Sequence, residues 1–444
     1  MKQSAVIFNS LLSILMILLL LSCKECPTEP EKVISLNISA PYIESTIVWL
    51  RISSTDSTRQ KSYTVVRDSL IISEGSFTGK DTIIADRQVE PNTTYSYSVQ
   101  YSDEVSDLLN VTTLELSSSY FTWEVLYFGE RNNILNSVSI ASEDNIWVVG
   151  QMEYWGWDSL DSEYDWIRYN GLHWNGERWN ILSIKPPPWT YKGPFDVAHA
   201  IDDTTVWIGI NSPALYLSGQ WQGYSSAPNL GWMCDIWGNS LDNTFFTYYD
   251  GGIAHYDGNK FTVMNSGTTT DLRDIDGNSE RVYIAGFSTT AGYERLILEY
   301  KDGQWNKLLK SETVDGNLNI GDFGRFNAVK VLDGVAVFTS AAMAAIKYYY
   351  RDQFYDGTPS QSTVLQDCYA IENMDGNAVN DLAYFTQGGE IVHYNGQYYI
   401  KVFDYSKMGY PGSVYFCSGD FKDDVICAVG DGGSGQGVVI IGRR

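Results

Sequence analysis

The chain has 444 residues, with 54 acidic side chains against 30 basic ones and a net charge of −24. This excess of negative charge repels the phosphates of nucleic acids and anionic lipid headgroups, so we exclude nucleic acid as a partner. Hydrophobic residues make up 44% of the chain, which is enough for more than one core. A chain of this length predicts two domains.

Residues 1–22 predict a secretory signal peptide. Lys2 precedes an apolar run over residues 11–21, and the run ends just before Cys23. A basic start followed by a short apolar stretch is typical of such a signal, and the run is shorter than the ~20 apolar residues of a spanning helix. Residues 20–23, Leu-Leu-Ser-Cys, resemble the bacterial lipobox, which implies cleavage before Cys23 and acylation of that residue.

Lipid on Cys23 implies attachment to a membrane. Each buried methylene group contributes about 0.8 kcal/mol, so several acyl chains hold a protein firmly. Lys24 follows Cys23 where Asp would favour retention, and we therefore expect the outer membrane of the bacterial cell envelope rather than the inner one. Residues 23–32 contain two prolines and predict a short, stiff tether.

Besides Cys23 the chain has five cysteines: Cys26, Cys234, Cys368, Cys417 and Cys427. An odd number cannot all pair within one chain. Cys417 and Cys427 flank the turn-like residues 419–423, which makes them candidates for a disulfide across a hairpin, with two buried thiols as the alternative. The pairing of the other three stays open. No spacing of Cys and His is typical of a metal site.

Residues 33–115 predict an antiparallel sandwich, because short alternating segments are bounded by polar or turn residues. These segments are 33–39, 46–52, 63–67, 82–85, 93–101 and 108–116. Within them, residues 89–99 resemble the fibronectin type III signature. The resemblance implies that Trp49 is the core tryptophan and that Tyr95 is a tyrosine corner, whose hydroxyl bonds to the backbone. We expect this domain to act as a spacer.

Residues 116–444 contain a recurring hairpin. Its four clearest copies have Asn or Asp before Gly, a pair typical of a type I′ turn, at Asn175-Gly176, Asp257-Gly258, Asp302-Gly303 and Asn395-Gly396. A second strand pair precedes each hairpin and occurs seven times. The aromatic residue after successive turns recurs every 40–49 residues. A period of this size with four strands per unit predicts a β-propeller.

The seventh unit lacks an outer strand, since only three residues follow the apolar residues 438–441. Residues 120–126 carry Trp123, the aromatic side chain expected on an outermost strand. We therefore predict an all-β chain in which a fibronectin type III-like sandwich precedes a seven-bladed β-propeller, closed by residues 120–126 so that no sheet edge is free. The repeat around residues 274–286 resembles YCF48-like and BNR-like secreted bacterial propellers, which implies a fold and not a function.

The sequence offers no catalytic residue. His173, His255 and His393 recur at one repeat position, which indicates packing or hydrogen bonding within the blades. The Asp-box pattern of sialidases is present only in its first half, at Ser240-Leu241-Asp242. The longest insertions fall between second and third strands and between blades, and these loops share one face of a propeller.

We place the candidate binding site in two of these insertions, residues 151–166 and 185–194. Exposed tryptophans stack on sugar rings, and closely spaced carboxylates hold Ca²⁺, although EF-hand spacing is absent and the alternative is a self-packed surface loop. No other cofactor is expected. The candidate residues are Trp155, Trp157, Asp158, Asp161, Glu163, Asp165, Trp166 and Trp189.

Together these patterns predict a cell-envelope lipoprotein, a monomer, that binds a glycan or a protein through the long-loop face of its propeller. One alternative is a polysaccharide-active enzyme, a glycoside hydrolase or lyase that uses carboxylates around the central channel. The other is a scaffold for envelope assembly. The sequence does not identify the ligand.

Overall fold

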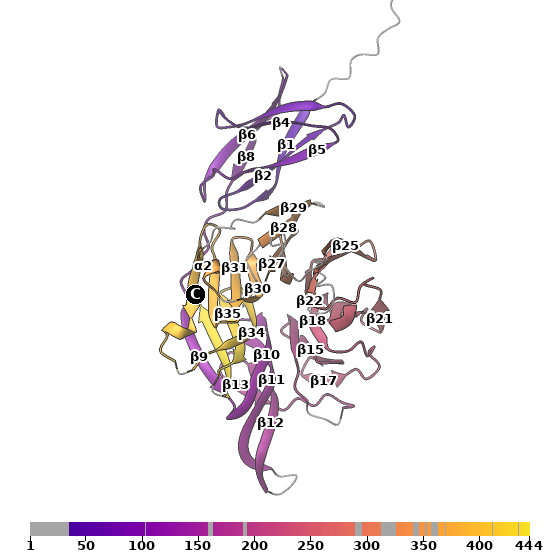
Figure 1. Cartoon of the computed structure of the whole chain (residues 1–444), viewed down its shortest axis with the longest axis vertical. Helices are drawn as coiled ribbons and strands as arrows, with labels where there is room; N and C mark the ends of the chain where they lie inside the picture. Colours follow the sequence, from indigo (N-terminus) through magenta and orange to yellow (C-terminus); the bar gives the residue numbers. More distant parts are fainter. Residues whose placement is uncertain are drawn as a thin grey trace, which may run out of the picture. The chain divides into compact units, whose positions relative to one another are not determined.

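The computed structural model describes residues 35–444 except 103, 159–162, 190–192, 289–294, 312–325, 341–345, 351–352, 357–362, 369, 411 and 434. The chain divides into two compact units, Met1–Leu114 and Glu115–Arg444, and both are built of strands (Figure 1). None of the helices in the described residues is long and apolar enough to cross a membrane.

The first unit contains two antiparallel sheets that pack on one hydrophobic core. One sheet has the order β1–β2–β5, with β1 (Leu36–Ile43), β2 (Val48–Ser54) and β5 (Asp81–Asp86). The other has the order β4–β3–β6–β7, with β8 paired to β6; its strands are β3 (Lys61–Arg67), β4 (Leu70–Phe77), β6 (Thr94–Tyr101), β7 (Glu104–Val105) and β8 (Leu109–Thr112). Leu50, Val65 and Tyr97 lie at the centre of the core.

The Tyr95 hydroxyl accepts the Glu90 N–H at 2.8 Å, as expected. Trp49 is buried with 5% exposed, but it alternates with Val48 and Leu50 along β2 and does not belong to the core cluster that contains them. Strands β4 and β7 were not predicted. Strand β4 does not follow the alternation of a half-buried strand, because Leu70 and Ile71 are consecutive and are 58% and 60% exposed. A period of two could not reveal it.

The second unit contains seven four-stranded sheets among the described residues. In chain order their strands are β10 (Arg131–Ser142), β11 (Asn145–Asp158), β12 (Glu163–Trp174) and β13 (Trp179–Leu182); β14 (Val197–Asp202), β15 (Thr205–Gly209), β16 (Pro213–Leu217) and β17 (Gln220–Gly223); β18 (Met233–Ser240), β19 (Asn243–Tyr248), β20 (Ile253–Tyr256) and β21 (Phe261–Met264); β22 (Leu272–Gly277), β23 (Val282–Phe287), β24 (Arg295–Lys301) and β25 (Gln304–Ser311). The remaining strands are β26 (Phe326–Leu332), β27 (Val335–Ser340), β28 (Ile346–Tyr350) and β29 (Gln353–Asp356); β30 (Ile371–Ala378), β31 (Asp381–Thr386), β32 (Glu390–Tyr394) and β33 (Tyr399–Asp404); and β34 (Tyr415–Lys422), β35 (Val425–Asp431), β36 (Gly437–Arg443) and β9 (Thr122–Phe128). Short helical turns are η1 (Tyr249–Gly251), α2 (Thr363–Gln366) and η2 (Tyr405–Lys407).

These sheets form a β-propeller. The first strand of each sheet lies beside the first strand of the next, and β34 lies beside β10, so the inner strands make a closed ring. Apolar side chains fill the space between neighbouring sheets; one such cluster joins Val148 and Leu172 of the first sheet to Val429 and Val439 of the last. Burial between sheets, rather than within one, therefore holds the ring together.

Strand β9 completes the last sheet, whose order is β34–β35–β36–β9. It runs antiparallel to β36, from Thr122 opposite Arg443 to Phe128 opposite Gly437. The pairing agrees with the prediction for residues 120–126, displaced by two residues along the chain. The Trp123 ring packs against Phe403 at 4.9 Å between ring centres.

The expected type I′ turns are wrong at three of the four sites. Type I′ needs positive φ at both central residues, and of the four pairs only Asp302-Gly303 has it, with φ of 53° and 81°. At Asn175, Asp257 and Asn395 the side-chain oxygen instead accepts backbone N–H groups two and three residues further on. Asn and Asp close such turns through their side chains, so at these three sites the same residue pair begins a loop that is longer than the two-residue type I′ turn.

Arg444 follows strand β36 and joins the last sheet to the neighbouring sheet that contains β31. Its guanidinium donates to both carboxylate oxygens of Asp381 at 2.8 and 2.6 Å, and the two side chains are 13% and 8% exposed. The Asp381 carboxylate also lies 2.8 Å from His393 Nε2. Burial alone would raise the pKa of Asp381, but the hydrogen bonds from Arg444 and His393 hold it well below its ordinary value.

Deleting residues 116–127 should cause aggregation. The deletion removes most of β9, exposes the backbone edge of β36 and uncovers Val438 and Ile440. Size-exclusion chromatography and thermal unfolding measure the effect, with Glu124→Gln, an exposed change in the same strand, as the control. A soluble monomer with an unchanged melting transition would contradict the role assigned to β9.

Arg444→Met should lower the free energy of unfolding at pH 7 by roughly 3–5 kcal/mol, because it removes the guanidinium partner of a buried carboxylate that keeps its contacts with His393 and Asn377. A depressed pKa stabilises the fold above the ordinary Asp value of about 4 and the contribution is lost as pH falls below it, so the difference should shrink at pH 3. Urea unfolding at both pH values tests this, with the exposed Arg178→Met as control. Equal losses at both pH values would argue against a charge effect.

Candidate functional site

The axial channel of the propeller is lined by polar side chains that connect the inner strands. Ser139 Oγ accepts the Ala200 N–H at 2.9 Å, which joins the first sheet to the second. Asp276 Oδ2 accepts the Val331 N–H at 2.7 Å, which joins the fourth to the fifth. Asp420 Oδ2 accepts the Ile140 N–H at 2.6 Å and so joins the last sheet to the first. The channel has a volume of about 290 Å³.

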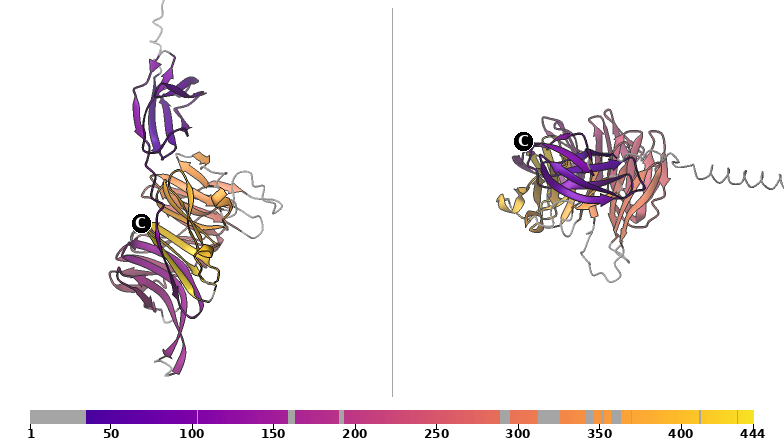
Figure 2. Two further views of the ribbon diagram at one scale, coloured as in Figure 1. Left: turned by 90° about the vertical axis from the view of Figure 1, so that its left-hand side faces the viewer. Right: turned by 90° about the horizontal axis from the view of Figure 1, so that it is seen from above.

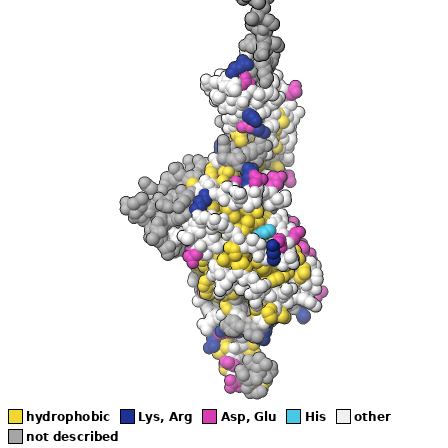
Figure 3. All heavy atoms as spheres, turned by 90° about the vertical axis from the view of Figure 1, so that its right-hand side faces the viewer, with side chains coloured by type: hydrophobic (Ala, Val, Ile, Leu, Met, Phe, Trp, Pro, Cys, Tyr) yellow, Lys and Arg dark blue, Asp and Glu magenta, His cyan; other side chains and the backbone are white. Residues whose placement is uncertain are grey.

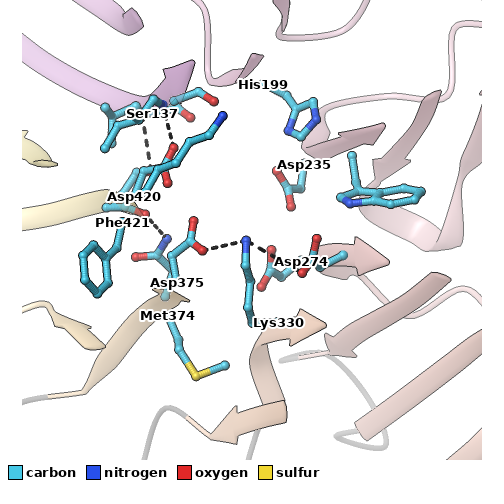
Figure 4. A pocket seen from close by; sticks show the side chains of 18 of the residues that line it. Ser137, His199, Asp235, Asp274, Lys330, Met374, Asp375, Asp420 and Phe421 are labelled. Carbon is cyan, nitrogen blue, oxygen red and sulfur yellow. Dashed lines mark hydrogen bonds and ion pairs between the residues drawn. The ribbon is translucent and has the colours of Figure 1, made fainter. Parts of the chain in front are cut away.

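Lys330 lies among the carboxyl groups of this channel (Figure 4). Its Nζ is 2.6 Å from Asp375 Oδ1 and 3.8 Å from Asp276 Oδ2. Burial alone would lower the pKa of Lys330, but the two carboxylates together raise it. The lysine therefore carries a positive charge that compensates part of the acid around it.

Burial raises the pKa of the channel acids. It brings the pKa of Asp276 to about 6 and that of Asp235 to about 6, while Asp235 shares a hydrogen bond with the Asp274 carboxyl group. Burial and the neighbouring Asp235 raise the pKa of Asp274 well above its ordinary value. Two acids in direct contact cannot both ionise easily, so this pair holds a proton.

A wider cavity of about 680 Å³, here called the funnel, continues from the channel. Five residues line both cavities: Ser137, Asp235, Asp274, Asn373 and Ser418. The funnel is also lined by Tyr249 and Phe287, which lie where second strands end. It therefore opens on the face that carries the loops between second and third strands.

Each of six inner strands has a β-bulge that places one side chain on the wall of the funnel. In each of β10, β18, β22, β26, β30 and β34 the register shifts by one residue and leaves one residue without a partner in the ladder. The six bulged residues, all of which line the funnel, are Asn136, Cys234, Arg273, Asn327, Glu372 and Cys417. Bulges re-aim side chains in this way beside binding sites.

The funnel was not predicted from the sequence. A signal was present, because at three of the six bulges an apolar residue is followed by two polar ones and then by another apolar residue, as in Leu272-Arg273-Asp274-Ile275 and Ile371-Glu372-Asn373-Met374. This spacing breaks the period of two in strands that otherwise alternate or are apolar throughout. It marks a bulge, but no single copy says that six side chains meet.

The predicted site at residues 151–166 is not a loop but the end of a long hairpin. Strands β11 and β12 extend beyond the other strands of their unit (Figures 1 and 2). Trp155 pairs with Trp166 and Trp157 with Tyr164, so the four rings share one face. Trp155, Trp157 and Tyr164 are 50–63% exposed, whereas Arg131 covers Trp166 at 3.9 Å from the ring centre.

The structure separates the predicted carboxylates from these rings. Glu163 and Asp165 alternate with Tyr164 and Trp166 along β12, so they point to the opposite face. Asp161 and the side chain of Asp158 lie outside the described residues. Within the described part of the chain, no group of three or more His, Cys, Asp or Glu is placed to hold a metal ion. Glu163 and Asp165 therefore do not share a face with the aromatic rings, and the Ca²⁺ site stays a prediction.

Trp189 was expected to project and does not. It packs against the cluster of the first two sheets, with Phe195 at 6.5 Å between ring centres, and its Nε1 donates to Ser225 Oγ at 3.2 Å. Hydrophobic side chains also reach the surface elsewhere on the propeller, as on the side seen in Figure 3. Exposure of an aromatic ring alone therefore does not mark a site.

The disulfide between Cys417 and Cys427 is also wrong. The hairpin pairs Cys427 with Asp420, and both thiols are free. Cys427 is buried in the apolar cluster between the last and first sheets, whereas Cys417 is the bulged residue in the funnel, where burial raises the pKa of its thiol to about 12. The alternative of two separate thiols is the correct one.

The three repeated histidines are structural, as predicted. His173 and His255 each lie about 3 Å from an Asn oxygen on the neighbouring strand, at 2.9 and 3.1 Å, and His393 contacts Asp381. His199 is different because it lines the channel and accepts the Gly238 N–H at 3.1 Å. Burial lowers the pKa of His199 to about 4, so it is neutral at pH 7.

No protein-family model matches this chain, and no curated protein does. Among solved structures it is similar to YCF48 bound to D1 peptide, with 13% identity and a TM-score of 0.51 over 74% of this chain and 97% of that one. It is also similar to the WD40 β-propeller domain of Doa1, with 10% identity and a TM-score of 0.46 over 73% and 98%. The computationally designed protein Ika8 gives 12% identity and a TM-score of 0.43 over 70% and 98%. The likeness to YCF48 shows the β-propeller fold.

Asp235→Asn should be tolerated better at pH 8 than at pH 4. At both pH values it replaces one of the two oxygens that accept the Ile236 and Ile275 N–H groups. A raised carboxyl pKa gives stability that is complete below about pH 4 and is lost as pH rises through about 6, the pKa of Asp235. The amide removes that loss, so the melting temperature of the variant relative to the unchanged chain should rise by a few degrees from pH 4 to pH 8. Thermal unfolding of this variant and of Glu124→Gln at both pH values checks the expectation. A relative melting temperature that is the same at both pH values would contradict it.

Proposed function

We propose that this chain is a binding module whose funnel takes a segment of a protein ligand. The funnel supports this because six bulged side chains and several aromatic rings converge in one cavity of about 680 Å³. Its aromatic residues include Trp232, Tyr249 and Tyr415, which are 54%, 36% and 45% exposed. Rings that are partly exposed beside hydrogen-bonding groups are typical of protein interfaces.

The solved structure of YCF48 bound to D1 peptide gives independent support, since that protein is a propeller that holds a peptide. The identity of 13% is too low to transfer the ligand. The likeness supports a peptide as the class of ligand and does not identify its sequence.

The remaining parts of the proposal concern attachment and architecture. We infer that residues 1–22 are removed, that Cys23 carries lipid and that the chain is held at the outer membrane; the lipobox resemblance supports this. The first unit is proposed to be a fibronectin type III-like spacer, supported by the Tyr95 hydroxyl contact. The seven sheets are proposed to be the blades of one seven-bladed ring, supported by the contact between β34 and β10.

A polysaccharide-active enzyme is less well supported. A glycoside hydrolase needs two carboxyl groups that reach opposite sides of a glycosidic bond, about 5–9 Å apart. In the channel, Asp235 and Asp274 contact each other directly, and Asp276 and Asp420 accept backbone N–H groups of neighbouring strands. These acids are engaged in holding the ring.

Trp232→Ala should abolish the binding of peptides selected on the full chain from an unbiased peptide library. The indole lines the funnel and is 54% exposed, so its loss removes contact area without opening the core. Trp155→Ala is the matched control, since this ring is 50% exposed but lies on the hairpin. Isothermal titration calorimetry measures the affinity of each variant.

Loss of binding in Trp155→Ala but not in Trp232→Ala would move the site to the hairpin. Selection of no peptide, together with binding or cleavage of polysaccharides on a glycan panel, would overturn the proposed function in favour of a glycan-directed one.

A further inference from the structure

The funnel is lined by more acidic side chains than basic ones. Four of the side chains that line it are carboxylic acids: Asp196, Asp235, Asp274 and Glu372. Among the described lining residues Arg273 is the one basic side chain. The acids therefore outnumber the base within a single cavity.

Arg273 is already engaged by the protein. Its Nη2 donates to Asp271 at 2.8 Å and its Nη1 to the Tyr249 hydroxyl at 3.2 Å. Its guanidinium lies 4.8 Å from the centre of the Tyr249 ring and 4.9 Å from that of Phe287. Its Nε is buried without an acceptor from the described protein. Asp271 pairs with its charge, and the guanidinium also attracts Glu372, so one positive charge is shared between Asp271 and the acids of the lining.

Two amide side chains each add an acceptor oxygen that receives no hydrogen bond from the described protein. Asn327 Nδ2 donates to the carbonyls of Ile371 and Glu372 at 2.6 and 2.9 Å, and Asn373 Nδ2 donates to that of Gly419 at 2.7 Å. These bonds leave Oδ1 of each amide buried and without a donor from the described protein. A buried acceptor in this state is unfavourable, and a ligand with N–H groups relieves it.

Burial makes the ionised form of these acids unfavourable, and a nearby cation offsets that cost. Burial raises the pKa of Asp196, of Glu372 and of Asp235. A positive charge nearby stabilises the ionised form of each. The exposed rings of Trp232 and Tyr415 at the same cavity add a surface that attracts cations through their π-electrons.

We propose that the funnel recognises a lysine or arginine side chain of its protein ligand. This inference rests on the proposed function and names the ligand chemistry of the same site. An ammonium or guanidinium group supplies only donors, which matches the unpartnered amide oxygens and the carboxylates together. The net charge of −24 steers a basic segment toward the protein before it enters the cavity.

Three short synthetic peptides test the proposal on the full chain. They share one sequence of serine and glycine in which every third position is lysine, glutamine or glutamate, and fluorescence anisotropy measures their affinity. The lysine peptide should bind at least tenfold more tightly than the glutamine peptide, a difference of about 1.4 kcal/mol, and the glutamate peptide should not bind.

Glu372→Gln should weaken the binding of the lysine peptide about tenfold, since it removes the negative charge of the proposed ion pair with a lysine ammonium group. Gln has almost the same shape and retains an oxygen for the contact with Gln387 Nε2, which is 2.6 Å long. Glu124→Gln on the outer strand β9 removes the same charge from an exposed position and should leave the affinity unchanged. Thermal unfolding confirms that both variants are folded.

Equal affinity for the lysine and glutamine peptides would overturn the inference while leaving peptide binding in place. An equal effect of Glu372→Gln and Glu124→Gln would also overturn it, because attraction would then come from the surface charge as a whole. The proposed function fails separately, when the unbiased library yields no peptide.

Discussion

The pairing of β9 with β36 is the interaction on which the second unit depends. It joins the start of the unit to its last strand, Thr122 opposite Arg443, and so supplies the fourth strand of the last sheet. With the ring closed, β34 lies beside β10, and the channel and the funnel have a continuous wall. A ring without β9 would leave one backbone edge open and the apolar residues beneath it in water.

Closure also explains why so many acids lie at the axis. Inner strands of neighbouring sheets do not share a hydrogen-bonded ladder, so their inward N–H groups need other acceptors. Side chains supply them: Ser139 for the Ala200 N–H and Asp276 for the Val331 N–H. A cluster of buried carboxyl groups in a propeller is therefore not in itself a sign of catalysis, since these groups satisfy backbone donors.

The sequence predicted the elements better than the site. Strand periodicity and the aromatic residue Trp123 located the closing strand to within two residues, because both are local consequences of burial on one face. The funnel depends on register instead. Arg273 and Glu372 are brought together by bulges in different sheets, and no local pattern encodes a meeting of residues that distant. Trp155 and Trp157 were conspicuous in the sequence because they are aromatic in an acidic segment, although their rings lie on a projecting hairpin.

In β22 and β30 the bulge places a side chain that joins two sheets next to a side chain that lines the funnel. In β22, Asp274 accepts the Val329 N–H at 2.7 Å and holds two sheets together, whereas the adjacent Arg273 has no partner in the ladder. The same division recurs in β30 between Asn373, which donates to Gly419, and Glu372. Not every bulged side chain is free of this structural role, since the bulged Asn327 donates to the carbonyls of Ile371 and Glu372 in the next sheet. Under the proposed function, the bulged side chains that do not join sheets set which ligand the funnel holds, while the fold stays the same.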